Sequence, residues 1–254
     1  MISLLEALIF SVVQGVSQWL PISSSGHIAI LQNIFGFQSL SFVVFLQLAS
    51  ILAVVVLFWK DIVKVFTFSK KENIKYFFML VVAVIPVAIV GYLFQKQVAA
   101  FFASLLYLGI FFIISGLVVY STKFVRPKKT EIGWLDSIFI GIMQAVSIVP
   151  GISRSGATIS GGMFRGISKT EAVKFSFLLA VPTILGAFVL ELRHSSIAGI
   201  SASMLVITFI ATFIVSIVAI KALLKIVRSD KFYLFGIYNF IVGLAVLVYY
   251  LTLH

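Results

Sequence analysis

The sequence predicts an all-α integral membrane protein with six transmembrane helices and two re-entrant helix pairs. Three observations lead to this prediction. The 254 residues are 61% hydrophobic and only 11% charged, whereas soluble domains contain roughly 25% charged residues. Six stretches are long and apolar enough to cross roughly 30 Å of hydrocarbon as helices. Two further apolar stretches are broken near the middle by Pro, Gly and Ser, and each is too short for two full crossings.

The composition excludes a water-soluble fold and thiol chemistry. The chain has no Cys, so disulfides are ruled out, and its 26 Phe suit lipid-facing surfaces. A net charge of +11 is compatible with nucleic-acid binding. In so apolar a chain, however, positive charge more often records membrane topology. The positions of the charges decide between these two interpretations.

The six predicted spans follow one another along the chain with short polar connections. They are Phe42–Trp59, Tyr76–Phe94, Phe101–Ser121, Ala172–Leu190, Ala202–Ile220 and Phe232–Leu253. Pro86 and Pro182 lie inside two of them, and neighbouring helices are expected to satisfy the carbonyls that proline frees. We expect kinks at both prolines.

The positive charges predict the orientation in the membrane. The 19 Lys and Arg fall into clusters at residues 60–75, 123–129, 165–174 and 221–231, except for Lys96, Arg154 and Arg193. Alternating the spans puts all four clusters on one side, which the positive-inside rule makes cytoplasmic. The sequence therefore predicts a multi-pass protein of the cell (plasma) membrane, with membrane lipids and no nucleic acid as partners.

The two broken stretches are Ile2–Phe37 and Ile132–Phe164. Ile2–Leu20 has no basic segment before it and no small-residue cleavage site, so it is expected to stay in the mature protein rather than to act as a signal peptide. Each broken stretch is interpreted as a re-entrant helix pair. Unwound backbone at this depth must be buried in protein or line a water-filled cavity.

An internal repeat relates the two broken stretches. A shift of 130 residues pairs Gln14 with Gln144, and it pairs the motif Ile22-Ser23 and Ser25-Gly26 with the same residues at 152–153 and 155–156. The chain is therefore predicted to be a single membrane domain over residues 1–254, with one repeat over about 1–121 and the second over about 131–254. Each repeat has three spans, so the second is inverted. Such breaks meet near the midplane, a plan that transporters also use.

The first break is QGVSQWLPISSSGH, residues 14–27. Gln14 and Gln18 share a helix face before Pro21 stops the helix. Serine hydroxyls and free amides at a helix start suit phosphate oxygens, and here they come from Ser23, Ser24, Ser25 and Gly26. His27 follows as an intramembrane ionisable group, which is costly to keep without a function. The alternatives are that Ser and Gly only allow close helix packing, and that His27 is a structural hydrogen-bonder.

The second break is VPGISRSGATISGG, residues 149–162. Arg154 is a basic residue at membrane depth with no obvious acidic partner, so an anionic ligand is the simpler explanation. Guanidinium binds phosphate in a two-pronged fork. Further phosphate-binding groups are expected from Gly151, Ser153, Ser155, Gly156 and Thr158. The alternative is that Arg154 bonds only backbone carbonyls of the opposing break.

These two motifs resemble those of the undecaprenyl-pyrophosphate phosphatase (bacitracin-resistance) family. The first break resembles its (E/Q)GxxEFLPxSSxGH pattern, and the second its PGxSRSGAT pattern. The segments FLQLASILAVVVLFW and FSFLLAVP resemble family segments too. The resemblance implies an inverted-repeat membrane enzyme that removes the terminal phosphate of a polyprenyl diphosphate. It also implies a divalent cation (Mg or Ca) and a site opening to the outer face. A homodimer is possible, and the sequence does not decide the oligomeric state.

Matched residue by residue, the resemblance assigns roles to the polar groups. It makes His27 and Ser24 the candidate nucleophile or its activator, Arg154 the phosphate clamp, and Ser153 and Thr158 phosphate-site hydroxyls. Gln18 departs from the pattern, which has a glutamate there, and Gln14 is an allowed variant. An amide cannot take a proton, although Gln14 and Gln18 could be weak metal ligands. A catalytically impaired lipid-phosphate binder or flippase is therefore the alternative function.

Overall fold

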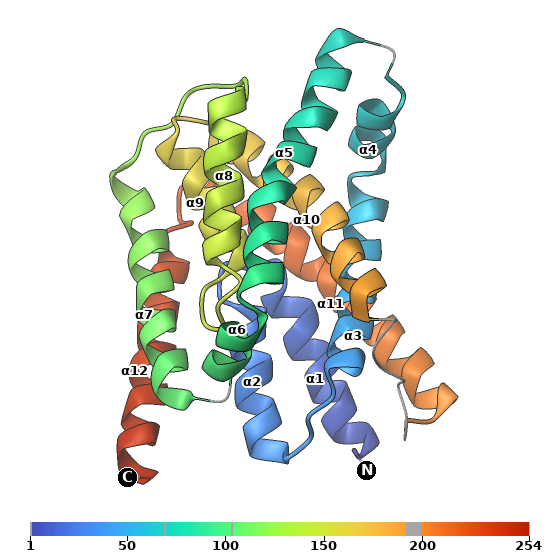
Figure 1. The fold of residues 1–254 in the computed structure, drawn as a ribbon, viewed down its shortest axis with the longest axis vertical. Helices are drawn as coiled ribbons and strands as arrows, with labels where there is room; N and C mark the ends of the chain where they lie inside the picture. Colours follow the sequence, from blue (N-terminus) through green and yellow to red (C-terminus); the bar gives the residue numbers. More distant parts are fainter. Residues whose placement is uncertain (1, 69, 103, 192–199, 254) are drawn as a thin grey trace.

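A computed structural model describes residues 2–68, 70–102, 104–191 and 200–253. Within these ranges, six helices are long and apolar enough to cross a membrane. Shorter helices form two pairs, and each pair folds back at one of the polar breaks (Figure 1). The prediction of an all-α, multi-pass membrane protein is confirmed.

The first half runs to the loop before residue 134. Its helices are α1 (Leu4–Ser17), α2 (Ser24–Phe35), α3 (Leu40–Leu57), α4 (Trp59–Phe66), α5 (Lys71–Leu93), α6 (Gln95–Phe102) and α7 (Leu105–Ser121), followed by the 3₁₀ turn η1 (Thr122–Phe124). The second half consists of α8 (Trp134–Val146), α9 (Arg154–Phe164), α10 (Lys169–Glu191), α11 (Ala202–Arg228) and α12 (Leu234–Leu253). Helices α5 and α10 continue through Pro86 and Pro182.

The six predicted spans correspond to α3, α5, α7, α10, α11 and α12, with their ends shifted. Two boundaries cross into a neighbouring helix. Trp59 belongs to the short helix α4, because α3 ends at Leu57. Phe101 and Phe102 belong to the short helix α6, and the third span begins at Leu105. The extended backbone of Ser104, at φ −118° and ψ 114°, separates α6 from α7. Residues 101–121 form one apolar run, so hydropathy alone does not show the break between α6 and α7.

Helices of the two halves pack against each other in pairs. Helix α7 lies along α12, α5 along α8, α1 along α11, and α3 along α10. In Figure 1 the pair α1–α2 occupies the lower half of the bundle and α8–α9 the upper half. This arrangement is the one expected of two halves of opposite orientation. The inverted repeat and its boundaries stay a prediction.

Glycines allow the close approach of α7 and α12. A Cβ added to Gly236 would lie 2.6 Å from the Tyr120 amide nitrogen and 2.7 Å from the Gly116 carbonyl oxygen. A Cβ on Gly243 would lie 2.9 Å from the Gly109 carbonyl oxygen. Small residues at such a contact let backbones meet directly, which is how membrane helices gain packing energy without a hydrophobic driving force.

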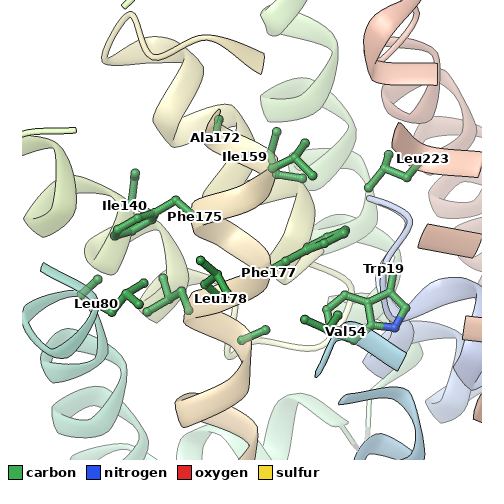
Figure 2. Close-up of a cluster of buried hydrophobic side chains, with 14 of the residues drawn as sticks. Trp19, Val54, Leu80, Ile140, Ile159, Ala172, Phe175, Phe177, Leu178 and Leu223 are labelled. Atoms are coloured by element: carbon green, nitrogen blue, oxygen red, sulfur yellow. The ribbon is translucent and has the colours of Figure 1, made fainter. Parts of the chain in front are cut away.

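The largest buried apolar cluster packs around α10 (Figure 2). Its side chains come from both halves, including Trp19 of the first break, Val54 of α3 and Phe177 of α10. The Trp19 and Phe177 rings meet edge to face at 4.9 Å between centroids. This cluster fixes the Trp19 indole, which in turn lies beneath Arg154.

The basic clusters gather at one end of the bundle, and both termini and α6 lie at the other (Figure 1). Ion pairs link segments from different parts of the sequence at the basic end. They are Lys129–Asp136, Arg165–Asp136, Lys169–Asp230 and Lys174–Asp61. Lys96 belongs to α6, whereas Arg193 lies outside the described residues.

Candidate active site

The first break is shaped by Pro21 and by a strained serine. Helix α1 ends at Ser17, and four residues later Pro21 removes a backbone donor. Ser23 has φ 65° and ψ 93°, an uncommon conformation for a residue with a Cβ. Its hydroxyl accepts a hydrogen bond from the Gly26 amide at 3.2 Å and so caps α2. Ser24 and Ser25 are thereby placed in the first turn of α2.

The second break repeats the serine cap 130 residues later, although Ser153 has an ordinary extended conformation, with φ −72° and ψ 122°. The Ser153 hydroxyl accepts a hydrogen bond from the Gly156 amide at 3.0 Å and caps α9. The Ser153 and Ser155 hydroxyls are 3.2 Å apart, as those of Ser23 and Ser25 are 3.3 Å apart. Gly151 has φ +97°, which favours glycine at this turn. The start of α9 therefore faces the same cavity as the start of α2, and Arg154 lies in the first turn of α9.

Contacts between the halves hold the two breaks together. The Ser155 hydroxyl donates to the Leu20 carbonyl at 3.1 Å, and the Asn239 side-chain amide of α12 donates to the Pro21 carbonyl at 2.8 Å. A Cβ added to Gly26 would lie 3.2 Å from the Gly151 Cα. The sequence-based expectation that the two breaks meet is confirmed by these contacts.

A cavity of about 170 Å³ lies where the breaks meet. Five of the predicted site residues line it: Gln18, Ser24, Ser25, Ser153 and Arg154. Polar groups from the surrounding helices complete the wall, and these are Ser17, Gln47, Gln144, Ser147 and Thr183. The apolar part of the wall comes from Val87, Ile148, Ile152 and Ile184. The cavity is therefore a polar compartment made by both halves.

Arg154 offers its guanidinium to this cavity. Its Nη1 is buried and has no hydrogen-bond partner among the described residues. The guanidinium carbon lies 5.5 Å from the centroid of the Trp19 ring, a cation–π contact that orients the group. The alternative in which Arg154 bonds opposing backbone carbonyls finds no such bond within the described chain.

Gln144 adds a second unpaired donor to the wall. Its Oε1 accepts a hydrogen bond from the Thr183 hydroxyl at 3.4 Å, and its Nε2 is buried without a partner among the described residues. A buried donor without an acceptor costs about 1–3 kcal/mol. An anion in the cavity would accept from both Gln144 and Arg154, so the cavity is built to receive negative charge.

Ser24 belongs to a short hydrogen-bonded chain of side chains. Its hydroxyl donates to Gln18 Oε1 at 2.9 Å, and Gln14 Nε2 donates to the same oxygen at 2.8 Å. Both lone pairs of that oxygen are thus used. Gln18 orients the Ser24 hydroxyl but, being an amide, cannot remove its proton.

His27 lies beside the cavity rather than in its wall. Its Nδ1 is 2.8 Å from the Ser23 carbonyl, so Nδ1 carries the hydrogen. Its Nε2 is 2.8 Å from the Tyr238 hydroxyl, which donates to it, and the two rings are stacked. Both ring nitrogens are therefore engaged in holding the strained Ser23 and in binding α12.

The remaining predicted site residues shape the cavity from behind its wall. Thr158 bonds the Arg154 carbonyl at 2.8 Å and the Ser176 hydroxyl at 2.6 Å, and Gln14 bonds Gln18. Ser23, Gly26 and Gly151 form the turns. The prediction omitted Gln47, Gln144 and Thr183 as site residues. A polar side chain inside an apolar span is the signal that marks each of them.

The donor set does not fit a tightly held divalent cation. Mg²⁺ and Ca²⁺ bind carboxylates and other oxygen ligands, and none of the described residues in the cavity wall has a carboxylate. Gln18 Oε1 already accepts two hydrogen bonds. Gln14 Oε1 is buried and without a partner among the described residues, but Gln14 does not line the cavity. No group of three His, Cys, Asp or Glu suited to a metal occurs in the described ranges.

Comparison with known proteins places the chain in a family. Residues 7–245 match the family model described as bacitracin resistance protein BacA. An undecaprenyl-diphosphatase of Methanococcus vannielii is 38% identical, over 96% of this chain and 100% of the relative. Relatives with the same name in Methanobrevibacter smithii and Carboxydothermus hydrogenoformans are 37% and 36% identical, each over 96% of both chains. The chain belongs to the BacA family of bacitracin resistance proteins.

Proposed function

We propose that the protein hydrolyses a polyprenyl diphosphate of the undecaprenyl type to the monophosphate and inorganic phosphate. The similar proteins named undecaprenyl-diphosphatase cover nearly the whole chain. The membrane-embedded cavity suits a substrate whose diphosphate is polar and whose tail is lipid. Recycling of a lipid carrier for cell-wall glycans is the corresponding role.

The observation that carries the proposal is the position of Arg154 opposite Ser24 in one cavity. The buried, unpaired Nη1 of Arg154 is a preorganised donor for a phosphate oxygen. Donors that are aimed at developing negative charge contribute strongly in a water-poor site. Gln144 Nε2 supplies a second such donor from α8.

Ser24 is the better candidate nucleophile, because both nitrogens of His27 are engaged. In the proposed reaction Ser24 Oγ attacks the terminal phosphorus and the bond from phosphorus to the bridging oxygen breaks, so the polyprenyl monophosphate leaves. The Ser24 proton passes to a non-bridging phosphate oxygen of the substrate, since Gln18 cannot keep it. Water then attacks the phosphoserine phosphorus, which releases inorganic phosphate and returns a proton to Oγ.

The cation implied by the family resemblance enters no step of this mechanism, because the cavity wall does not fit it. Arg154 and the amide donors balance the phosphate charge instead. The basic loops are placed in the cytoplasm of a plasma-membrane protein by the positive-inside rule. The family resemblance implies a site that opens to the outer face, and the proposed reaction takes its substrate from that side.

The test is release of inorganic phosphate by the purified protein. We expect release from undecaprenyl diphosphate and none from undecaprenyl monophosphate. Ser24→Ala should lower release to a small residual rate that comes from binding and the remaining donors, while Ser229→Ala, an exposed serine at the basic end, should not lower it. Tight binding of the diphosphate without any release would instead indicate a lipid-phosphate binder.

A further inference from the structure

A second cavity, of about 520 Å³, lies at the basic end of the bundle. We call it the basic cavity. Its charged wall is made of Arg126, Lys128, Lys169, Arg228 and Asp230. These residues come from the α7–α8 loop, the start of α10 and the end of α11. Three separate connections thus converge on one hollow.

Positive charge in the basic cavity is largely uncompensated. Asp230 pairs with Lys169. Within the described part of the chain, Arg126, Lys128 and Arg228 have no carboxylate within 4.0 Å. Three formal positive charges therefore face a cavity without a neutralising partner. Phosphate oxygens are the preferred ligands of arginine forks.

The surroundings of the basic cavity are those of a membrane interface. The Lys123 ammonium lies 5.5 Å and 5.3 Å from the ring centroids of Tyr120 and Tyr233. Phe124 follows Lys123 in the sequence and directly precedes Val125 of the cavity wall, and its side chain is 75% exposed. Aromatic and basic side chains together at the end of spans mark the headgroup level of a bilayer. Phosphate groups at this level of a bilayer belong to lipid headgroups, so a phosphate ligand of the cavity would carry acyl chains.

Another cavity at the same end provides an internal contrast. It measures about 430 Å³ and also contains lysines, namely Lys64, Lys75 and Lys174. Four acidic residues share its wall, and these are Asp61, Glu72, Glu131 and Glu171. Its formal charge is therefore negative. The two cavities at this end therefore have formal charges of opposite sign, although both contain lysines.

We propose that the basic cavity binds the phosphate headgroup of an anionic glycerophospholipid. Arg126 and Arg228 would hold the phosphate, with Lys128 nearby. The exposed Phe124 and the Tyr120 and Tyr233 rings would lie against the acyl region. This site is independent of the proposed phosphatase reaction, because none of its residues lines the cavity between the breaks.

The experiment measures lipid bound to the intact, purified protein by native mass spectrometry. Phosphatidylglycerol is the probe and phosphatidylcholine is the neutral comparison. We expect at least tenfold tighter binding of phosphatidylglycerol, and we expect Arg126→Gln/Arg228→Gln to remove that preference. Lys64→Gln/Lys75→Gln, which removes equal charge from the contrasting cavity, should retain it.

Three outcomes would overturn the proposal. The first is equal binding of the two lipids by the unaltered protein, which needs no variant to fold. The second is displacement of phosphatidylglycerol by millimolar inorganic phosphate, because the site would then be one for soluble phosphate. Retained preference in a folded Arg126→Gln/Arg228→Gln protein would likewise place the lipid elsewhere.

Discussion

Gln18 determines how the Ser24 hydroxyl is held. Its amide oxygen receives hydrogen bonds from Ser24 and from Gln14, so it orients the hydroxyl without removing its proton. A carboxylate at this position would accept the same two hydrogen bonds and could also take the proton. The chain therefore keeps the geometry of an activated serine while lacking a protein base next to it.

Gln18→Glu should raise the turnover number for phosphate release by about 10²-fold, the lower range for a positioned general base. The rate of the variant should fall at low pH as the new carboxylate is protonated. Steady-state kinetics across pH would show both effects. Gln47→Glu is the matched control, because it adds a carboxylate to the same cavity from α3, whereas the Ser24 hydroxyl donates its hydrogen bond to Gln18. Equal acceleration by both variants would contradict a base acting on Ser24.

Arg154→Met should lower kcat/KM by about 10²- to 10³-fold, the usual loss when one preorganised donor to a developing anion is removed. Lys96→Met in α6 removes the same charge at an exposed position and should leave kcat/KM unchanged. Initial rates of phosphate release give both values. If the two variants lose activity equally, Arg154 acts only through net charge.

Chelation provides a separate test of the carboxylate-free wall. Binding of undecaprenyl diphosphate should be unchanged by excess EDTA, because the cavity offers a cation no carboxylate ligand. Isothermal titration of the ligand-free protein with Ca²⁺ should show no binding, whereas Gln18→Glu should create it. A tenfold loss of diphosphate affinity with EDTA would mean that a cation is required after all.

At the scale of elements, the α7–α12 contact depends on glycine. Gly236→Ala places a methyl group against the backbone of Tyr120 and Gly116, so the helices must separate. Overpacking of this kind costs about 1–3 kcal/mol. We expect a lower midpoint of thermal unfolding in detergent. Gly186→Ala in α10 meets nothing within 4 Å and should leave the midpoint unchanged or raise it.

The sequence predicted the long helices well and the short ones poorly. A run such as Leu40–Leu57 is apolar throughout, and its length alone identifies a span. Helix α4 begins at Trp59, one residue after α3 ends, and contains charged residues. Helix α6 merges with the apolar run before α7. Hydropathy cannot separate helices that are joined by one or two residues, since the signal is averaged over a longer window.

At the scale of the whole molecule, the site depends on both halves. The repeated Ser-Gly motifs predicted that the breaks would meet, and the Ser155–Leu20 contact confirms it. Which side chains face the cavity could not be predicted. Orientation is set by tertiary partners, as when Tyr238 engages His27 and Ser176 engages Thr158. Gln144 was recognised only as the counterpart of Gln14, because spacing does not show which donors remain unpaired.

The absence of Cys from the sequence allows a direct test of orientation. Single substitutions Lys71→Cys, Lys128→Cys and Ser229→Cys place thiols at exposed positions of the basic end, and Lys96→Cys places one at the opposite end. A membrane-impermeant maleimide should label only Lys96→Cys in intact cells and all four after lysis. Labelling of the basic end in intact cells would reverse the orientation.

The central claim is that the two breaks form one catalytic phosphate site. It is tested most directly by a double-mutant cycle of Ser24→Ala and Arg154→Met, read as kcat/KM for phosphate release from undecaprenyl diphosphate. Groups that act together on one phosphate are strongly non-additive. The double variant should therefore lose little more than the worse single variant. Losses that multiply would show that Ser24 and Arg154 act independently, and would contradict a single site.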